Sequence, residues 1–154
     1  MTPDTVERNK VKNKTFTYKT SVTWTGGRSG TVSSEGKPLL KVSSPPEFKG
    51  EPGVWSSEDM FVASVEVCHM EIFVAYAARK DLEIVSYKSH TNGVLEYIDG
   101  DYRFTRIVIF PTITVSSRVA ESEVHSLLRE AQRHCLVANS IASIVEVNPT
   151  IIVQ

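Results

Sequence analysis

The first third of the chain alternates between strand-like and turn-like segments. Residues 15–24 are rich in β-branched and aromatic side chains, and the larger apolar ones stand at even spacing, at Phe16, Tyr18, Val22 and Trp24. This period-two pattern predicts a strand with one buried face. Glycine-rich turns then predict two further strands, at 28–34 and 38–43. Prolines and glycines crowd 44–55, so we expect a loop there.

A long apolar helix follows this loop. Ser56 can cap its first turn, and Asp59 stands where a side chain can bond back to the cap. Between residues 60 and 78, apolar side chains occur on nearly every side of the helix. One stripe recurs at intervals of four and three residues: Phe61, Val65, Cys68, Ile72 and Ala75. Because a helix that is apolar all round needs cover on all sides, we expect it to be buried at the centre of the fold.

The rest of the chain predicts three strands, a second helix and a last strand. The expected elements are strands at 84–87, 93–98 and 102–115, a helix at about 120–134, a short helical piece near 137–142 and a strand at 145–153. Strands and helices come in blocks, which favours an α+β fold with antiparallel sheets packed on the long helix. We expect a polar N-terminal segment, residues 1–14, followed by a single domain, residues 15–154.

The charge of the chain is nearly balanced. Its 154 residues carry 17 Lys and Arg against 18 Asp and Glu, which leaves a formal net charge of −1. This balance excludes a nucleic-acid coat and a polybasic membrane anchor. Residues 1–14 hold no secretory apolar region, and no stretch approaches ~20 consecutive apolar residues. We therefore expect a soluble, cytoplasmic protein with no nucleic-acid or membrane partner.

Two cysteines carry most of the potential chemistry. Cys68 and Cys135 could each be a small apolar side chain in the core. A reactive Cys68 would need a nearby positive group, because the helix dipole acts only within the first turn. Arg28 is the candidate for that group, since its Gly-Gly-Arg-Ser-Gly turn leaves the side chain unshielded; alternatively, it is a solvated turn residue. The same turn lacks the Lys-Ser/Thr of a phosphate-binding loop.

Histidines beside both cysteines suggest a metal site as a further alternative. The pairs are Cys68-His69 and His134-Cys135. Adjacent residues on a helix point about 100° apart, so both members of a pair cannot easily reach one ion. We expect no metal site.

Three segments together resemble one protein family. Residues 25–36, Thr-Gly-Gly-Arg-Ser-Gly-Thr-Val-Ser-Ser-Glu-Gly, resemble the N-terminal turn of organic hydroperoxide resistance proteins. The segment from Glu58 to Cys68 resembles the helix that carries the peroxidatic cysteine of that family, with a glutamate ten residues earlier. Residues 130–140, around Cys135, resemble the helix of the resolving cysteine. Over about residues 15–153 the chain is thus similar to the OsmC/Ohr family.

This resemblance implies an intertwined α+β homodimer that reduces organic hydroperoxides, without a cofactor, at the expense of a dithiol of the dihydrolipoamide type. Cys68 would be the peroxidatic thiol and Cys135 the resolving thiol, and the two would form a disulfide. Arg28 would stabilise the thiolate, and Glu58 would hold Arg28 in place.

The chain also departs from the family pattern. Leu136 follows the second cysteine where the better-known members usually have proline, and His69 stands where a small or aromatic residue is expected. A family member that keeps the fold without turnover, as a thiol sensor or a small-ligand-binding protein, is the alternative function.

The spacing of Glu58 and Cys68 sets a geometric condition on the site. Ten residues of continuous helix separate them by ~15 Å along the axis and about 80° around it. If Glu58 serves the thiolate, it should come from a second chain. The apolar neighbours of Cys68, together with Phe48 and Trp55 of the 44–55 loop, favour bulky organic peroxides over hydrogen peroxide.

Overall fold

A computed structural model describes residues 14–154, so almost all of the predicted N-terminal segment lies outside the described residues. The elements follow in the order β1 (Ser21–Gly26), β2 (Ser29–Ser33), β3 (Leu40–Ser43), the 3₁₀ turn η1 (Pro46–Phe48), α1 (Ser57–Arg79), β4 (Ile84–Ile98), β5 (Asp101–Val115), α2 (Glu121–His134), the 3₁₀ turn η2 (Ala138–Ser140), β6 (Ile144–Val147) and β7 (Thr150–Val153). The predicted α+β class is confirmed.

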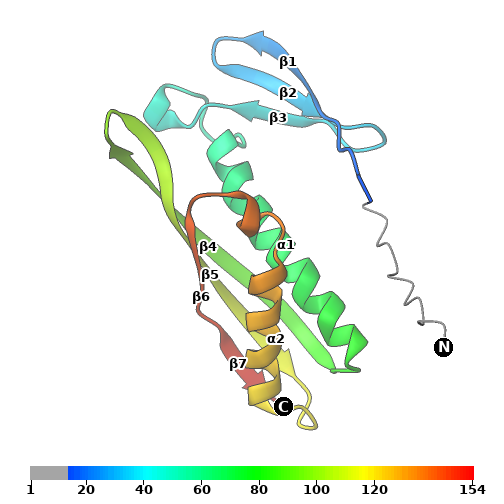
Figure 1. Cartoon of the computed structure of the whole chain (residues 1–154). Coiled ribbons are helices and arrows are strands. Elements are labelled where there is room, and N and C mark those ends of the chain that lie inside the picture. Colours follow the sequence, from blue (N-terminus) through cyan, green and yellow to red (C-terminus); the bar gives the residue numbers. More distant parts are fainter. Residues whose placement is uncertain (1–13) are drawn as a thin grey trace, which may run out of the picture.

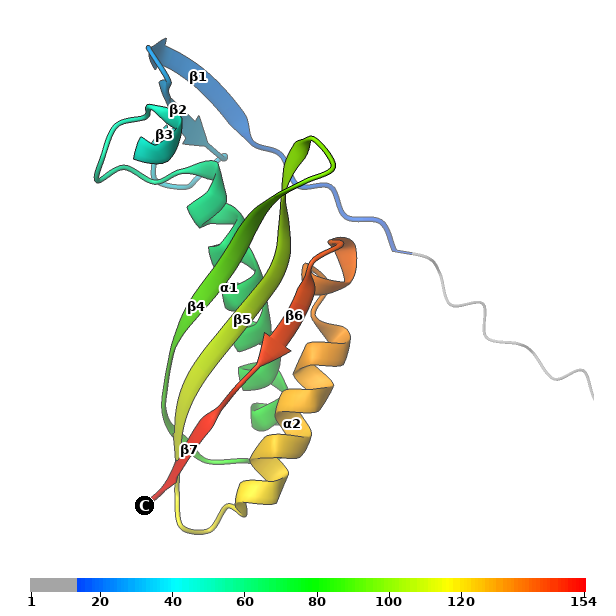
Figure 2. The ribbon, with the colours of Figure 1, turned by 90° about the vertical axis from the view of Figure 1, so that its left-hand side faces the viewer.

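The strands form two separate sheets (Figure 1). β1, β2 and β3 make an antiparallel sheet that stands at the N-terminal end of α1. β4 and β5 form one long antiparallel hairpin, and β6 and β7 both pair with β5 in parallel. The second sheet is therefore mixed rather than antiparallel as expected. α1 and α2 run side by side along this second sheet (Figure 2). The three-stranded sheet is therefore attached to the helical layer mainly through the 44–55 segment.

The predicted first strand needs correction. It begins at Ser21 rather than at residue 15, and the side chains of its expected buried face are exposed: Phe16 74%, Tyr18 89%, Val22 71% and Trp24 75%. The period-two pattern is present, but no described element of the same chain packs against that face. A strand with one apolar face needs a partner surface, and a single chain does not supply it.

Two other strand predictions also change. β4 is one strand of 15 residues, where the sequence predicted two strands with a gap at 88–92. Residues 88–92 are all polar, so the sequence shows no alternation of apolar and polar side chains there. β5 nevertheless pairs with β4 along its whole length. The predicted last strand is divided into β6 and β7 at Asn148-Pro149, because a proline has no N–H to donate to the ladder.

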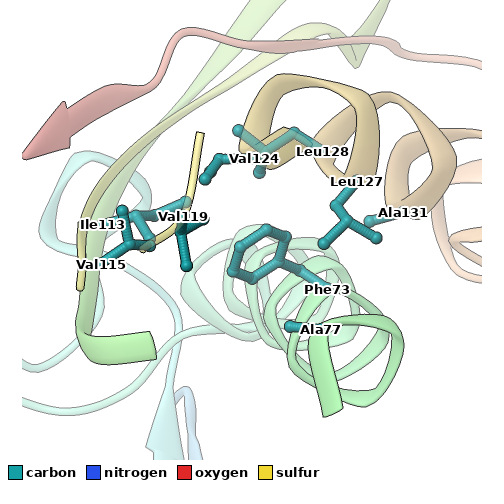
Figure 3. Close-up of a cluster of buried hydrophobic side chains, with 9 residues drawn as sticks. All are labelled: Phe73, Ala77, Ile113, Val115, Val119, Val124, Leu127, Leu128 and Ala131. Atoms are coloured by element: carbon teal, nitrogen blue, oxygen red, sulfur yellow. The ribbon is translucent and has the colours of Figure 1, made fainter. Parts of the chain in front are cut away.

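The core lies between the two helices and β5. Phe73 of α1 is fully buried and is surrounded by Leu127 and Ala131 of α2 and by Ile113 of β5 (Figure 3). A smaller cluster around Val65 continues the core toward the N-terminal end of α1. These two clusters fix α1 against α2 and the sheet, and so fix the direction in which each side chain of α1 points.

Helix α1 is buried on one side only. Its N-terminus carries the predicted cap: the Asp59 N–H donates to Ser56 Oγ at 3.1 Å, and the Ser56 N–H donates to the Asp59 carboxylate at 2.9 Å. On the opposite side from the core, Val67 and Val74 are 47% and 43% exposed. A single chain therefore covers α1 on one side only, and the expected burial of the whole helix would need a second chain. By length and composition α1 could also cross a membrane, a test that the core helices of globular proteins pass as well.

Candidate functional site

Two cysteine thiols meet in the interior, where α2 ends against α1. Cys68 faces α2 from the middle of α1 and is 6% exposed. Cys135, the residue that ends α2, is 1% exposed. Both are free thiols, and Cys68 lies close enough to Cys135 to act directly on the ionisation of its thiol. The fold thus places side by side the two groups that a disulfide between these helices would join.

The environment of Cys135 favours the protonated thiol. Burial raises its pKa to about 11, and the neighbouring Cys68 adds to this shift. The backbone N–H groups of Ala138 and Val137 oppose it, because they stabilise the thiolate. Since the thiolate is the nucleophile, Cys135 is poorly prepared to make the first attack on a peroxide at neutral pH.

His69, the residue after Cys68, is buried at the contact with α2. It is 1% exposed, and its two ring nitrogens have no hydrogen-bond partner among the described residues. Burial lowers the pKa of His69, although the backbone of Leu128 favours the charged form to a smaller extent. Within residues 14–154, no three His, Cys, Asp or Glu side chains gather as metal ligands.

Arg28 lies in the turn between β1 and β2, at the exposed end of the three-stranded sheet. Gly26 and Gly27 have φ angles of 125° and 54°, which L-residues with side chains rarely adopt, so the turn depends on these glycines. The Arg28 carbonyl accepts a hydrogen bond from the Ser44 N–H at 3.2 Å, which ties the turn to the 44–55 segment. Its guanidinium forms no salt bridge with the described residues of its own chain.

Glu58 lies in the first turn of α1 and accepts a hydrogen bond from Ser57 Oγ at 3.0 Å. α1 is continuous from Ser57 to Arg79, so no break brings Glu58 toward Cys68 of the same chain. Glu58 and Arg28 form no salt bridge in a single chain. One chain therefore unites the two predicted thiols but leaves Arg28 and Glu58 apart from them and from each other.

Glu58 lines a groove of about 950 Å³ between the N-terminal half of α1, the 44–55 segment and the β4–β5 hairpin. Four aromatic residues are among its walls: Phe48, Trp55, Tyr102 and Phe104. Phe48 packs edge-on against Tyr102 with ring centroids 5.3 Å apart, which holds the 44–55 segment on the hairpin. Cys68 does not line this groove, because it points toward α2.

Gly93 sets how closely the hairpin approaches α1 at the groove. A Cβ atom at this position would overlap Val62 Cγ2 and would lie 2.9 Å from Phe104 Cε1. A side chain at residue 93 would therefore push β4 away from α1. The groove keeps its shape because this position is glycine.

With this geometry established, comparison with known proteins identifies the family. A model of the OsmC-like protein family matches residues 50–150. The chain belongs to the OsmC-like family. The match covers α1, the long hairpin, α2 and both cysteines, so the resemblance noted from the sequence is confirmed.

Solved structures share this OsmC-like fold at low sequence identity. An OsmC-like protein of unknown function from Vibrio cholerae is 22% identical, with a TM-score of 0.82 over 88% of this chain and 100% of that one. An organic hydroperoxide resistance protein from Legionella pneumophila is 21% identical, with a TM-score of 0.71 over 89% and 97%. One from Elizabethkingia anophelis is 19% identical, with a TM-score of 0.73 over 92% and 99%. No curated protein sequence matches the chain.

Sequence reasoning pointed to part of the groove. Phe48 and Trp55 were expected at the entrance to Cys68, and both line the groove, which does not include Cys68 of the same chain. Glu66 was missed, although it also lines the groove and is the one acidic residue between Asp59 and Glu71. A lone carboxylate in an apolar helix is the signal that could have drawn attention to it.

Proposed function

We propose that this OsmC-like protein is a thiol-dependent peroxidase that reduces organic hydroperoxides to alcohols. The observation that carries the proposal is the buried contact between Cys68 and Cys135, which belong to separate helices. The fold that the chain shares with proteins named for organic hydroperoxide resistance supports it.

The chemistry proceeds through two half-reactions. The Cys68 thiolate attacks the peroxide, the O–O bond breaks, and the departing alkoxide takes up a proton to leave as the alcohol. Cys68 then holds the second oxygen as a sulfenic acid. The Cys135 thiol displaces this oxygen, which leaves as water, and a disulfide forms. An external dithiol of the dihydrolipoamide type reduces the disulfide by two exchange steps and is itself oxidised to a disulfide.

The protonated state of Cys135 fits the second role rather than the first. Burial, reinforced by the neighbouring Cys68, raises the pKa of Cys135, so its thiol stays protonated at physiological pH. Cys135 can react once Cys68 has become a sulfenic acid, because the two side chains are already neighbours and little motion is needed.

The working unit in this proposal is a homodimer. A single chain leaves apolar side chains exposed on the outer side of α1, at Val67 and Val74. It also leaves Phe16, which precedes β1, and Trp24 of β1 exposed. A second copy would bury both surfaces. In that assembly Arg28 and Glu58 of one copy would meet at Cys68 of the other. Light scattering should give twice the chain mass, and Val74→Lys should yield monomers.

The test of the reaction is a peroxidase assay with a matched pair of cysteine variants. The wild type should consume cumene hydroperoxide with dihydrolipoamide or dithiothreitol as reductant. Cys68→Ser should lose turnover and should no longer form a sulfenic acid. Cys135→Ser should still form one equivalent of sulfenic acid, which a dimedone probe traps. Consumption of peroxide that is independent of Cys68 would overturn the proposal.

A ligand-binding or sensing role without turnover is the second candidate. The observation in its favour is the groove of about 950 Å³, which contains no cysteine of its own chain. Binding of an apolar ligand together with an inactive Cys68 would favour this role. A soluble, cytoplasmic location stays a prediction for either function.

A further inference from the structure

We infer that Glu66 sets the selectivity of the groove by disfavouring organic hydroperoxides that carry a carboxylate remote from the peroxide group. This inference rests on the proposed function, in which the groove that carries Glu58 opens toward Cys68 of the second copy.

The groove has the size and walls of a site for an apolar molecule. Its volume of about 950 Å³ lies within the ~300–1,000 Å³ range of small-molecule sites. Its lining residues include aromatic and aliphatic side chains and four carboxylates, with no Lys, Arg or His. An anionic ligand would thus enter a groove in which no lining side chain of the same chain offers it a positive charge.

Three of the four groove carboxylates are either bound to other groups or exposed to solvent. Asp59 is held in the capping box of α1. Glu47 is exposed, and Glu58 would be paired with Arg28 in the shared site.

Glu66 remains as the uncompensated charge of the groove. It is partly buried where α1 faces β4, and one of its oxygens accepts a hydrogen bond from Ser89 Oγ at 2.5 Å. No described basic side chain forms a salt bridge with it. Its influence reaches the neighbouring Tyr87, where burial and the charge of Glu66 raise the pKa of the phenol to about 12.

The distance from Glu58 to Glu66 sets how far a substrate's carboxylate must lie from its peroxide group to meet Glu66. Eight residues of α-helix separate the two by ~12 Å, about the length of a ten-carbon alkyl chain. A fatty-acid hydroperoxide that presents its peroxide near Glu58 would therefore bring its carboxylate to Glu66. The two like charges would repel each other, whereas the ester of the same molecule would meet no such repulsion.

The kinetic test compares linoleic acid hydroperoxide with its methyl ester. The wild type should favour the ester in kcat/KM, and Glu66→Gln, which still accepts the bond from Ser89, should reduce this preference at least tenfold. Glu71→Gln, on the exposed side of the same helix, should leave the preference unchanged. An apolar groove can favour the ester in both proteins, so the informative quantity is the ratio of kcat/KM for the ester to kcat/KM for the acid. If this ratio is the same in the wild type and in Glu66→Gln, the inference is overturned.

A binding test separates this inference from the proposed reaction. Calorimetry on Cys68→Ser, which cannot turn over, should show tighter binding of 1-decanol than of decanoate. Glu66→Gln in the same background should reduce the ratio of the two dissociation constants at least tenfold. If this holds while the wild type lacks peroxidase activity, the selectivity of the groove stands and the proposed function fails. If Cys68-dependent activity exists but Glu66→Gln changes neither ratio, the inference alone fails.

Discussion

Cys68 and Cys135 touch at the point where α2 ends, so one cysteine belongs to a rigid helix and the other to a helix terminus. Cys135 has φ −66° and ψ 102°, outside the helical region, and the chain then continues into the short η2 turn. Its side chain can therefore approach Cys68 without unwinding α2. In the proposed reaction, the peroxide-reacting thiol is thus held within a helix and the resolving thiol at a helix terminus.

This arrangement predicts a disulfide after one turnover. One equivalent of cumene hydroperoxide added without reductant should lower the mass of the chain by two hydrogens, and peptide mapping should link residues 68 and 135. Neither single variant, Cys68→Ser or Cys135→Ser, should show the linked peptide. Two alkylatable thiols per chain after peroxide treatment would contradict the prediction.

The ionisation of Cys135 gives a second prediction. Its pKa rises from an ordinary 9.0 to about 11 in the folded chain. The folded state thus holds its proton more tightly, and this contribution to stability is present below pH 9 and lost as the pH rises toward 11. Thiolate absorbance at 240 nm, taken as the difference between Cys68→Ser and the double variant with Cys135→Ser, should show a midpoint well above 9. A midpoint at or below 9 would contradict the buried environment described for Cys135.

His69 predicts a stability change at mildly acidic pH. Its pKa is lowered from 6.5 by burial, so the unfolded chain binds a proton that the folded chain resists. The stability linked to this group is present above pH 6.5 and is lost as the pH falls below it. The Tm should therefore drop between pH 7 and pH 5, and His69→Gln should flatten that dependence. His125→Gln serves as the control, because His125 is partly exposed beside Glu121.

A further prediction concerns the shape of the groove. Gly93→Ala should destabilise the fold by about 1–3 kcal/mol, because its Cβ would overlap Val62. Val62→Ala in the same chain should recover much of the loss, since it removes the methyl groups that clash. The measurement is the free energy of unfolding in urea for both single variants and the double variant. Additive losses in the double variant would contradict the close approach of β4 to α1.

The sequence predicted most of the elements because local patterns encode them. The cap of α1, its continuous helical run and the amphipathic face of α2 depend on neighbouring residues, and all three are present. The middle of β4 was missed because its polar residues are held by pairing with β5, which no local pattern reveals. For the same reason the sequence could not show that Glu66 lies in the groove, because the β4–β5 hairpin forms that groove with α1.

Two expected buried surfaces are exposed in a single chain. Apolar positions on β1 and on the outer side of α1 were read as buried, and in a single chain they are exposed. The pattern records where apolar side chains are, but not which molecule covers them. The same reasoning applies to the separated site residues, and it leads to the last prediction.

Subunit complementation tests whether the site is shared. Within one chain Glu58 lies eight residues before Glu66 and ten before Cys68, on a helix without a break. Ten residues rise ~15 Å, too far for direct contact with the thiol. If Glu58 of one copy serves Cys68 of the other, a heterodimer of Glu58→Ala and Cys68→Ser chains contains one site with both residues intact. Its activity should approach half that of the wild type, although each parent homodimer is impaired.

Arg28→Ala mixed with Cys68→Ser should recover in the same way, because Arg28 would act across the same interface. An intrachain site would instead be damaged in both subunits, so a verified heterodimer without recovery, or a fully active monomer, would show that the site belongs to one chain.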